Sequence, residues 1–380
     1  MKTVTPETFA AQAGGPIEPL SGAIVPPIHL STTFERDPDN AYSKGYIYGR
    51  PDTPTVRMTE EVLNRLEGGA ATLLFGSGMA AATALFLSLE RPAHIVAPKV
   101  MYWGLRRWLA EQTAAVGLSV TFVDNADLNA LRAAIIPGRT RCVWLETPSN
   151  PTWVVSDIAA VAKIAHAAGA IVGADSTVSS PVITRPIEFG ADVVMHAATK
   201  YLNGHSDVVA GSLTFKAKDA LFDRAAGVRR DIGAILAPFE AFLLMRGMRT
   251  LHVRVRHQTA SALTIARHFA NNGRVAEVLY PGLANHPGHE IARRQMPGGF
   301  GGMLSIRVAG GEAAAIRTAA HVQVWKRATS LGGVESLIEH RASIEGPTSP
   351  CPPDLLRLSV GVEDVGDLIA DLEWALVANA

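Results

Sequence analysis

The stretch His196-Ala197-Ala198-Thr199-Lys200-Tyr201-Leu202-Asn203-Gly204-His205-Ser206-Asp207 decides how this chain is interpreted. It follows the apolar run Ala191 to Met195, which predicts a buried strand. The end of that strand delivers a hydroxyl group, from Thr199, and an amine, from Lys200, just before a polar turn that contains glycine. Removing a lysine amine from water is costly. Lys200 therefore lies there either because of the topology of the fold or because of its chemistry.

A second predicted strand, Ala170-Ile171-Val172-Gly173-Ala174, ends in Asp175-Ser176-Thr177. Pyridoxal phosphate requires a lysine that can form a Schiff base and a buried carboxylate from a neighbouring strand. The lysine carries the aldehyde, and the carboxylate keeps the pyridine nitrogen protonated so that the ring accepts electrons. The alternative is an ordinary strand-end lysine whose ammonium group reaches water along its apolar stem.

The composition excludes several classes of function. The 380 residues suffice for a large core and for more than one domain. Basic and acidic residues number 35 each, which gives no support to binding of nucleic acid or an anionic membrane. The two cysteines, Cys142 and Cys351, cannot build a disulfide framework. The first residues lack the apolar stretch of a signal peptide, and no uncharged apolar run reaches membrane-spanning length. We therefore expect a soluble, cytoplasmic protein.

The chain divides into three predicted parts, and the first two are an arm and a large domain. Residues 1–54 are rich in Pro, Gly, Ser, Thr and Tyr, which predicts an arm that packs on something else. Residues 55–240 alternate helices with short apolar strands. The strand-like runs are 71–75, 94–97, 119–123, 142–145, 170–174, 193–196 and 212–215. This alternation predicts a mostly parallel, seven-stranded sheet covered on both faces, with ligands bound at the carboxyl ends of the strands.

Residues 241–380 predict a smaller α/β domain, which makes the whole chain an α/β protein. A long helical stretch from about 238 to 271 leads into it, and it contains strands at 303–308 and 356–360 and helices at 311–320 and 365–377. On the bridging stretch, His252, Arg254, Arg256 and His257 predict a solvated face and not a nucleic-acid site.

The turn Gly76-Ser77-Gly78 is a candidate anion site. It joins a strand to a helix start, where free backbone N–H groups and the positive end of the helix dipole point outward. It lacks the spacing of a P-loop, and glycines at such turns are often only steric. The later run Gly298-Gly299-Phe300-Gly301-Gly302 leads into a strand and predicts a turn or a bulge.

Other segments place polar side chains where a ligand could bind. Tyr48 and Arg50 lie two residues apart in an extended segment and so on one side, a pair suited either to a phosphate group or to the protein surface. Asn150 follows the strand that ends in Glu146. Arg357 lies within an apolar strand and needs an anion, such as a substrate carboxylate. The histidines and cysteines show no zinc spacing, and Gly-x-Ser-x-Gly is absent, so we expect neither a metal site nor a serine hydrolase.

Taken in order, these motifs resemble the Cys/Met-metabolism family of pyridoxal-phosphate enzymes. The family includes cystathionine β-lyases, γ-lyases and γ-synthases, methionine γ-lyases and O-acylhomoserine sulfhydrylases. The matching segments are Val25-Pro26-Pro27-Ile28, Tyr48-x-Arg50, Ser77-Gly78-Met79-Ala80-Ala81, Glu146-Thr147-Pro148-Ser149-Asn150-Pro151-Thr152, Asp175-x-Thr177, Thr199-Lys200-Tyr201, Gly204-His205-Ser206-Asp207, Gly332-Gly333-Val334-Glu335-Ser336-Leu337 and Arg357-Leu358-Ser359-Val360-Gly361. The resemblance runs from about residue 20 to the end. It implies a fold of the aspartate-aminotransferase type (fold type I) with pyridoxal phosphate as the cofactor.

The resemblance also implies a role for each matching residue. Lys200 holds the cofactor and moves protons, Asp175 pairs with the pyridinium nitrogen, and Tyr102 stacks on the ring and helps in proton transfer. The other expected cofactor-binding residues are Gly78, Met79, Thr177 and Thr199, joined by Tyr48 and Arg50 from a neighbouring subunit. The residues expected to hold the substrate carboxylate and its surroundings are Asn150, Ser336 and Arg357. The shared site implies an obligate homo-oligomer, a dimer usually doubled into a tetramer.

Several positions depart from the family's pattern. Ala197 stands where serine is usual, which removes one phosphate hydrogen bond worth about 0.5–1.5 kcal/mol. Ile47 precedes the arm tyrosine where many γ-specific members have Glu, and Trp103 follows Tyr102 where Gly is common. Arg341 stands where proline is usual and could add positive charge near the pocket. The arm resembles bacterial β-lyases and the C-terminal motifs fit γ-enzymes, so the signals for β and γ chemistry conflict.

We therefore predict an enzyme that removes the Cα proton of an L-amino acid with Lys200 and expels a heteroatom group from Cβ or Cγ. Elimination is preferred, as in a cystathionine-type carbon–sulfur lyase, and an oxygen-linked γ-substituent, as in canavanine or an O-acylhomoserine, stays open. The alternative is γ-replacement, as in cystathionine γ-synthase or O-acylhomoserine sulfhydrylase. An alternative from another class is a non-catalytic regulator that binds pyridoxal phosphate.

Overall fold

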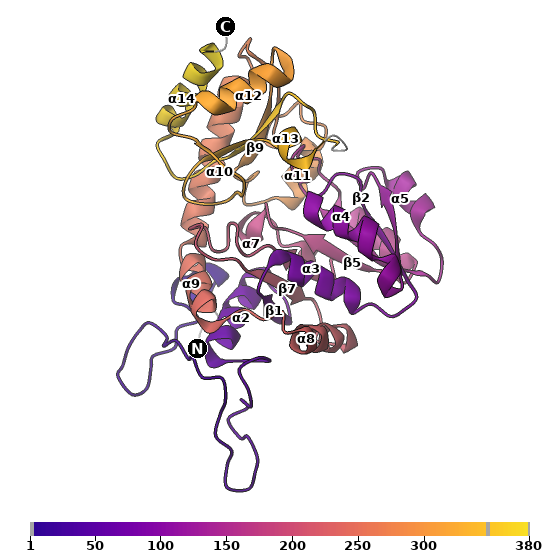
Figure 1. Ribbon diagram of the computed structural model, residues 1–380, viewed down its shortest axis with the longest axis vertical. Coiled ribbons are helices and arrows are strands. Elements are labelled where there is room, and N and C mark those ends of the chain that lie inside the picture. The colour runs from indigo at the N-terminus through magenta and orange to yellow at the C-terminus, as the bar shows by residue number, and fades with distance from the viewer. Residues whose placement is uncertain (1–3, 347–349, 379–380) are drawn as a thin grey trace.

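The chain folds around two sheets that two consecutive helices connect (Figure 1). The computed structural model describes residues 4–346 and 350–378. The larger sheet has the strand order β1-β7-β6-β5-β4-β2-β3. Its strands are β1 (Ala71–Phe75), β2 (Ala93–Pro98), β3 (Leu118–Val123), β4 (Thr140–Glu146), β5 (Ile171–Asp175), β6 (Val193–His196) and β7 (Gly211–Phe215). Only β7 runs antiparallel to its neighbours. The predicted seven-stranded, mostly parallel sheet is confirmed.

The central strands are apolar throughout because helices cover both faces of the large sheet. Alternate residues of a strand point to opposite faces. On β4, Trp144 packs with residues of α3 (Gly78–Leu87) and α4 (Trp103–Gln112). Its neighbour Leu145 packs with residues of α5 (Leu128–Ala134) and α6 (Ile158–Ala167). The sheet is therefore buried, and its strand ends form the rim at which polar groups gather.

The smaller sheet has the order β10-β11-β12-β9-β8 and is mainly antiparallel. Its strands are β8 (Val275–Leu279), β9 (Met303–Val308), β10 (Lys326–Arg327), β11 (Leu337–His340) and β12 (Leu355–Ser359). It shares a core with α12 (Gly311–His321) and α14 (Val365–Val377). The sequence indicated β9 and β12 and missed the other three. The boundaries 55–240 and 241–380 stay predictions.

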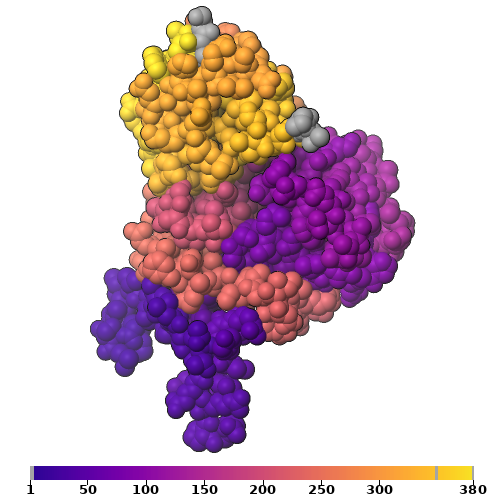
Figure 2. Space-filling view, in the orientation of Figure 1, coloured from indigo at the N-terminus to yellow at the C-terminus, as the bar shows by residue number. Residues whose placement is uncertain are grey.

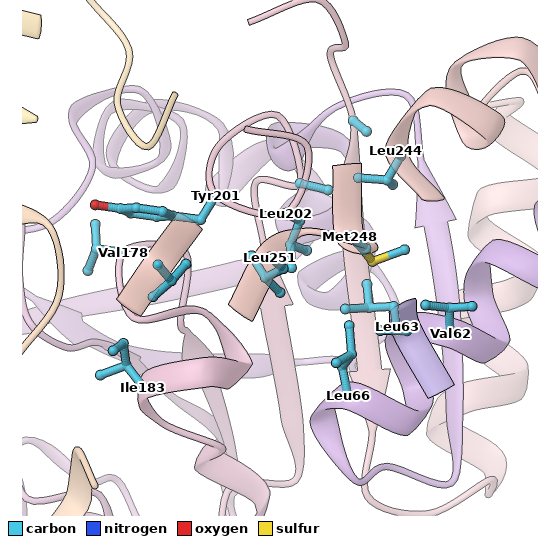
Figure 3. Close-up of a cluster of buried hydrophobic side chains, with 14 of the residues drawn as sticks. Val62, Leu63, Leu66, Val178, Ile183, Tyr201, Leu202, Leu244, Met248 and Leu251 are labelled. Carbon is cyan, nitrogen blue, oxygen red and sulfur yellow. The ribbon is translucent and has the colours of Figure 1, made fainter. Parts of the chain in front are cut away.

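The predicted bridge between the two sheets consists of two helices, α9 (Pro238–Met248) and α10 (Leu251–Phe269). Leu244, Met248 and Leu251 of this bridge pack against α2 (Pro54–Glu67), as Figure 3 shows. Figure 3 also shows Tyr201 and Leu202, the two residues after Lys200, in the same apolar cluster. The segment that carries Lys200 is therefore anchored in the core that joins the two parts of the chain.

The prediction of a solvated face on the bridge is wrong for Arg254. Its side chain is buried and donates hydrogen bonds to the carbonyl oxygens of Tyr201 (2.9 Å) and Gly247 (2.8 Å). Burial lowers its pKa to about 10. A cation suits this place because several carbonyl groups converge at the end of α9. Arg256 and His257 are exposed, as predicted.

The N-terminal arm extends away from the rest of the chain (Figures 1 and 2). Its first helix, α1 (Pro6–Ala11), packs near α2. The following segment, up to Thr53, exposes large apolar side chains. Leu20 is 96% exposed, Ile24 71% and Leu30 70%. Large apolar side chains with this much exposed surface indicate a region that binds a partner.

Candidate active site

The ends of β4, β5 and β6 open into a cavity of about 250 Å³. Eight of the predicted site residues line it: Gly78, Met79, Tyr102, Asn150, Asp175, Thr177, Thr199 and Lys200. They come from five separate segments of the chain, which the parallel sheet brings to one rim. The cavity also has apolar lining residues, among them Val178, Met195 and Leu331.

Lys200 lies just beyond the end of β6 and lines the cavity. Its Nζ atom donates a hydrogen bond to Oγ of Ser330 at 2.7 Å. Burial, together with the positive charge of Arg357, lowers the pKa of Lys200 to about 8. More of this lysine is thus a neutral amine near neutral pH than of a solvated lysine, and the neutral amine is the form that attacks an aldehyde or takes a proton.

Sequence reasoning missed Ser330, although it lies in contact with Lys200. It belongs to a turn of the C-terminal part and has a left-handed backbone with φ of 86°. Its carbonyl oxygen also accepts a hydrogen bond from Arg357 Nη2 at 2.8 Å. The glycine-rich motif that follows marks a turn, but nothing in the sequence pairs that turn with a lysine 130 residues away.

Asp175 ends β5, next to β6. Its Oδ1 atom accepts a hydrogen bond from the Thr177 backbone N–H at 3.0 Å, and only 6% of the residue is exposed. Burial raises the pKa of Asp175, while the hydrogen bonds from Thr177 and the nearby His196 oppose the rise. The Thr177 hydroxyl accepts a hydrogen bond from Ala197 N–H at 2.9 Å. The carboxylate is therefore fixed at the cavity by contacts between two strand ends.

The turn before α3 supplies free N–H groups at the cavity. Ser77 caps this helix by accepting from Ala80 N–H at 3.0 Å, and Gly78 and Met79 follow it in the first turn, where N–H groups lack partners within the helix. A Cβ atom at Gly78 would lie 2.8 Å from the Ala197 Cβ, so only glycine fits. The Thr199 hydroxyl lies at the same rim and exchanges hydrogen bonds with Ala210. These groups fit a phosphate.

A second carboxyl group, that of Glu146, also lines the cavity and was not among the predicted site residues. It ends β4, where its Cα pairs in register with that of Asp175. Burial and the nearby Asp175 raise the pKa of Glu146 to about 8. The signal was available in the sequence, because Glu146 ends a buried strand as Asp175 does.

Arg357 reaches the cavity through other residues. It lies on β12, is 4% exposed, and donates to Glu339 Oε2 at 2.7 Å and to Asn150 Oδ1 at 3.2 Å. Glu339 lies opposite it on β11. The anion that Arg357 requires in its apolar strand is thus the Glu339 carboxylate of the protein itself. Asn150 lines the cavity, so Arg357 lies directly behind a cavity residue.

Arg341 forms part of the same charged group. It starts α13 (Arg341–Glu345) and donates to Glu339 Oε2 at 2.8 Å and to Glu345 Oε1 at 2.6 Å. Its side chain is only 5% exposed. The possible extra positive charge at this position is therefore balanced by two carboxylates, a correction to the expectation from sequence.

Besides Arg357, three predicted residues do not line the cavity. Ser336 is fully buried, its hydroxyl donates to Glu363 at 2.7 Å, and it accepts from Gly361 N–H at 2.8 Å. Tyr48 and Arg50 lie on the arm, where the Arg50 guanidinium stands 5.5 Å from the centre of the Tyr48 ring. Both arm residues are exposed. Their predicted contribution to a neighbouring subunit's site stays a prediction.

The described residues contain neither a metal-binding cluster nor a helix suited to a membrane. Within residues 4–346 and 350–378, no three His, Cys, Asp or Glu side chains are grouped so that they could hold a metal ion. In the same ranges, no helix combines the length and the apolar character needed to cross a membrane.

The model of the family described as Cys/Met metabolism PLP-dependent enzymes matches residues 7–377 of this chain. The chain belongs to that family. It is similar to the cystathionine γ-synthase of Mycobacterium tuberculosis, with 43% identity over 98% of this chain and 96% of the relative. It is also similar to the cystathionine γ-lyase of Dictyostelium discoideum, with 38% identity over 97% of each. A solved structure of the γ-synthase of Xanthomonas oryzae pv. oryzae, in complex with aminoacrylate and cysteine, gives a TM-score of 0.94 at 36% identity, covering 100% of this chain and 99% of that one.

These findings confirm the predicted family, the aspartate-aminotransferase-type fold and the pyridoxal phosphate cofactor. They also confirm an enzyme of the class that breaks or replaces carbon–sulfur bonds in amino acids, which rules against the non-catalytic regulator. The choice between elimination and replacement, the roles of single residues and the oligomeric state go beyond the family assignment.

Proposed function

We propose that this enzyme expels a heteroatom group from Cγ of an L-amino acid and replaces it with a thiol. This is the γ-replacement reaction, which the sequence left as the alternative to elimination. The observation that carries the proposal is likeness over the whole chain to proteins named cystathionine γ-synthase, both in sequence, at 43% identity, and in structure, at a TM-score of 0.94.

The contacts at the cavity support a role for each main residue. Lys200 has a pKa lowered to about 8, so its amine can take the Cα proton and return it further along the substrate. When bound, pyridoxal phosphate supplies a ring that accepts electrons. Asp175 would hold the protonated ring nitrogen, and the N–H groups of Gly78 and Met79 would hold the phosphate. Asn150, with Arg357 behind it, would hold the substrate carboxylate.

The exposed arm supports a site completed by a second copy of the chain. Tyr48 and Arg50 have no place at the cavity of their own chain, and the apolar residues around them stand in water. We infer that the arm packs against a second copy and brings these two residues to its phosphate site. Mixing Arg50→Ala and Lys200→Ala subunits should then restore activity, because one mixed dimer assembles one intact site. No recovery after confirmed subunit exchange would contradict the shared site.

Elimination at Cγ is the second candidate, because a cystathionine γ-lyase matches over 97% of the chain at 38% identity. Both reactions begin with loss of the same Cα proton and the same leaving group. In replacement, a thiol then adds to Cγ. In elimination, protons from water are added instead and no thiol is incorporated. The cytoplasmic location expected from the sequence stays a prediction.

The test is an assay with an O-acylhomoserine, with and without cysteine. Replacement predicts cystathionine as the main product when cysteine is present, detected by mass spectrometry. Release of 2-oxobutyrate and ammonia at an unchanged rate in the presence of cysteine would make elimination the main reaction. Turnover only on cystathionine with pyruvate as the product would move the chemistry to Cβ and overturn both γ candidates.

A further inference from the structure

Glu146 is a buried carboxyl group that contacts two of the proposed site residues at once. Only 4% of it is exposed. Its Oε2 atom accepts a hydrogen bond from the backbone N–H of Tyr102 at 2.6 Å. Its Oε1 atom accepts one from the backbone N–H of Asn150 at 2.9 Å. One side chain therefore uses both of its oxygen atoms to fix two segments that meet at the cavity.

Both contacted residues lie outside the regular helices and strands. Tyr102 is the N-cap residue of α4 and makes no side-chain capping bond. Its ring lies over Gly104, where a Cβ atom would come within 2.9 Å of it. Asn150 lies in a loop between β4 and α6, and its amide oxygen accepts from Arg357. A shift of either backbone would move a side chain that lines the cavity.

We propose that Glu146 is a positioning residue that holds the Tyr102 ring and the Asn150 amide in their places on the cavity wall. The inference rests on the proposed roles of Tyr102 toward the cofactor ring and of Asn150 toward the substrate. Glu146 acts through these two residues and forms no bond to substrate or cofactor itself.

The chemistry of the contact explains why a carboxyl group is needed. Each carboxyl oxygen keeps a lone pair that accepts a hydrogen bond, in the ionised and in the protonated form. A glutamine amide has one accepting oxygen and one nitrogen that only donates. Glu146→Gln would therefore set an N–H donor against another donor, either at Tyr102 or at Asn150.

The contacts of Glu146 do not depend on its charge. Burial and Asp175 raise the pKa of Glu146 to about 8, and Glu345 adds to the rise, whereas the two backbone N–H groups oppose it. Near neutral pH much of Glu146 thus carries a proton. A protonated carboxyl group still accepts both hydrogen bonds, so the two contacts persist in either form.

The experiment compares Glu146→Gln with Asp371→Asn, each prepared with the cofactor bound. Asp371, on α14, is also buried and accepts from the backbone N–H groups of Val324 (2.8 Å) and Trp325 (3.0 Å), but it lies in the small domain. The readouts are thermal stability, the visible absorbance band of the bound cofactor and its pH midpoint, the cofactor dissociation constant, and KM with kcat.

Glu146→Gln should move the band or its pH midpoint, weaken cofactor binding, and raise KM, with a loss of about tenfold for a missing hydrogen bond in a buried site. The Asp371→Asn control should lower thermal stability and leave the band and KM unchanged. A Glu146→Gln enzyme that loses only stability, as the control does, would overturn the inference. If this variant does not fold, Glu146→Asp, whose carboxylate falls short of both N–H groups, should change the same readouts.

Two further variants separate this inference from the proposed function. Tyr102→Phe and Asn150→Ala test the roles on which it rests. If neither changes the band or KM, those roles fail and the inference falls with them. If they do change these readouts and Glu146→Gln does not, the proposed roles stand and the positioning by Glu146 alone is overturned.

Discussion

Two groups of charged side chains, one lining the cavity and one behind its lining, carry charge in different ways. The strand-end wall, formed by Glu146 and Asp175, has two buried acids whose hydrogen bonds, among the described residues, come from backbone N–H groups and the Thr177 hydroxyl. The arginine wall, formed by Glu339, Arg341, Glu345 and Arg357, lies behind the lining residue Asn150 and pairs two cations with two anions. In the proposed roles, the first wall would supply a negative charge to the protonated ring nitrogen of the cofactor. The second has its arginines neutralised, so we expect it to select a substrate carboxylate by geometry more than by net charge.

The largest expected effect comes from removing the negative charge of the strand-end wall. Asp175→Asn should retain the cofactor and lose a factor of about 10²–10³ in kcat, because the ring nitrogen is no longer held by a charge at the moment electrons reach the ring. Steady-state kinetics on the cofactor-saturated variant measure this. Asp192→Asn is the matched control, since Asp192 accepts from Val172 N–H at 2.7 Å at the opposite end of the same sheet. Near-normal kcat in Asp175→Asn would show that the ring is protonated in another way.

On the arginine wall, Arg357→Lys should mainly raise KM. A lysine keeps the charge but cannot contact Glu339, Asn150 and Ser330 together. We expect KM to rise by about 30-fold, the equivalent of roughly 2 kcal/mol for a buried charge pair that is disrupted, with a smaller change in kcat. Arg307→Lys is the control, because Arg307 is 38% exposed and pairs with Asp354 on the same sheet. Equal effects of the two substitutions would remove the special role of Arg357.

The rate at which the cofactor-free enzyme captures pyridoxal phosphate should depend on pH through Lys200. Burial lowers the pKa of this lysine from 10.5 to about 8, and only the neutral amine attacks the aldehyde. Capture should therefore speed up by about tenfold per pH unit below pH 8 and level off above it. The appearance of the visible absorbance band, followed over pH 6–10, measures the rate. A rate that still rises tenfold between pH 9 and pH 10 would place the lysine in a solvated environment.

The smallest effect on substrate binding is expected from Arg341→Met. Glu339 would then pair with Arg357 alone, and coupling of roughly 0.5–1 kcal/mol between such neighbours would raise KM by about threefold. The free energy of unfolding should fall by about 3 kcal/mol, because Glu345 and Glu339 lose a buried partner. Kinetics and denaturant unfolding of the same preparation separate the two effects. A KM increase as large as that of Arg357→Lys would show that Arg341 itself takes part in substrate binding.

Each wall was predicted only in part: Asp175 was predicted and Glu146 was missed, and Arg357 was predicted and its partners were missed. Asp175 and Lys200 follow apolar runs, and the rule that ligands bind at the carboxyl ends of parallel strands places them together. Arg357 was found because it interrupts an apolar strand. Its partner Glu339 was missed, since the pairing depends on the register between β11 and β12.

Other misses have the same physical origin. Arg254 lies on a helix face with Arg256, and the helical pattern does not tell which of them meets the carbonyl oxygens of Tyr201 and Gly247. Ser330 contacts Lys200 only because the C-terminal part folds over the large sheet. Periodicity reports which residues are buried. It does not report which distant polar groups meet once they are buried.

The central claim is that Lys200 is the residue that binds the cofactor, and reduction with borohydride tests it most directly. Borohydride converts the linkage between cofactor and lysine into one that survives proteolysis, so mass spectrometry can locate it. The account predicts the cofactor mass on the peptide that contains Lys200 in the wild-type enzyme, and no labelled peptide in Lys200→Ala. A label on another lysine in the wild-type enzyme, or a labelled peptide that persists in Lys200→Ala, would contradict it.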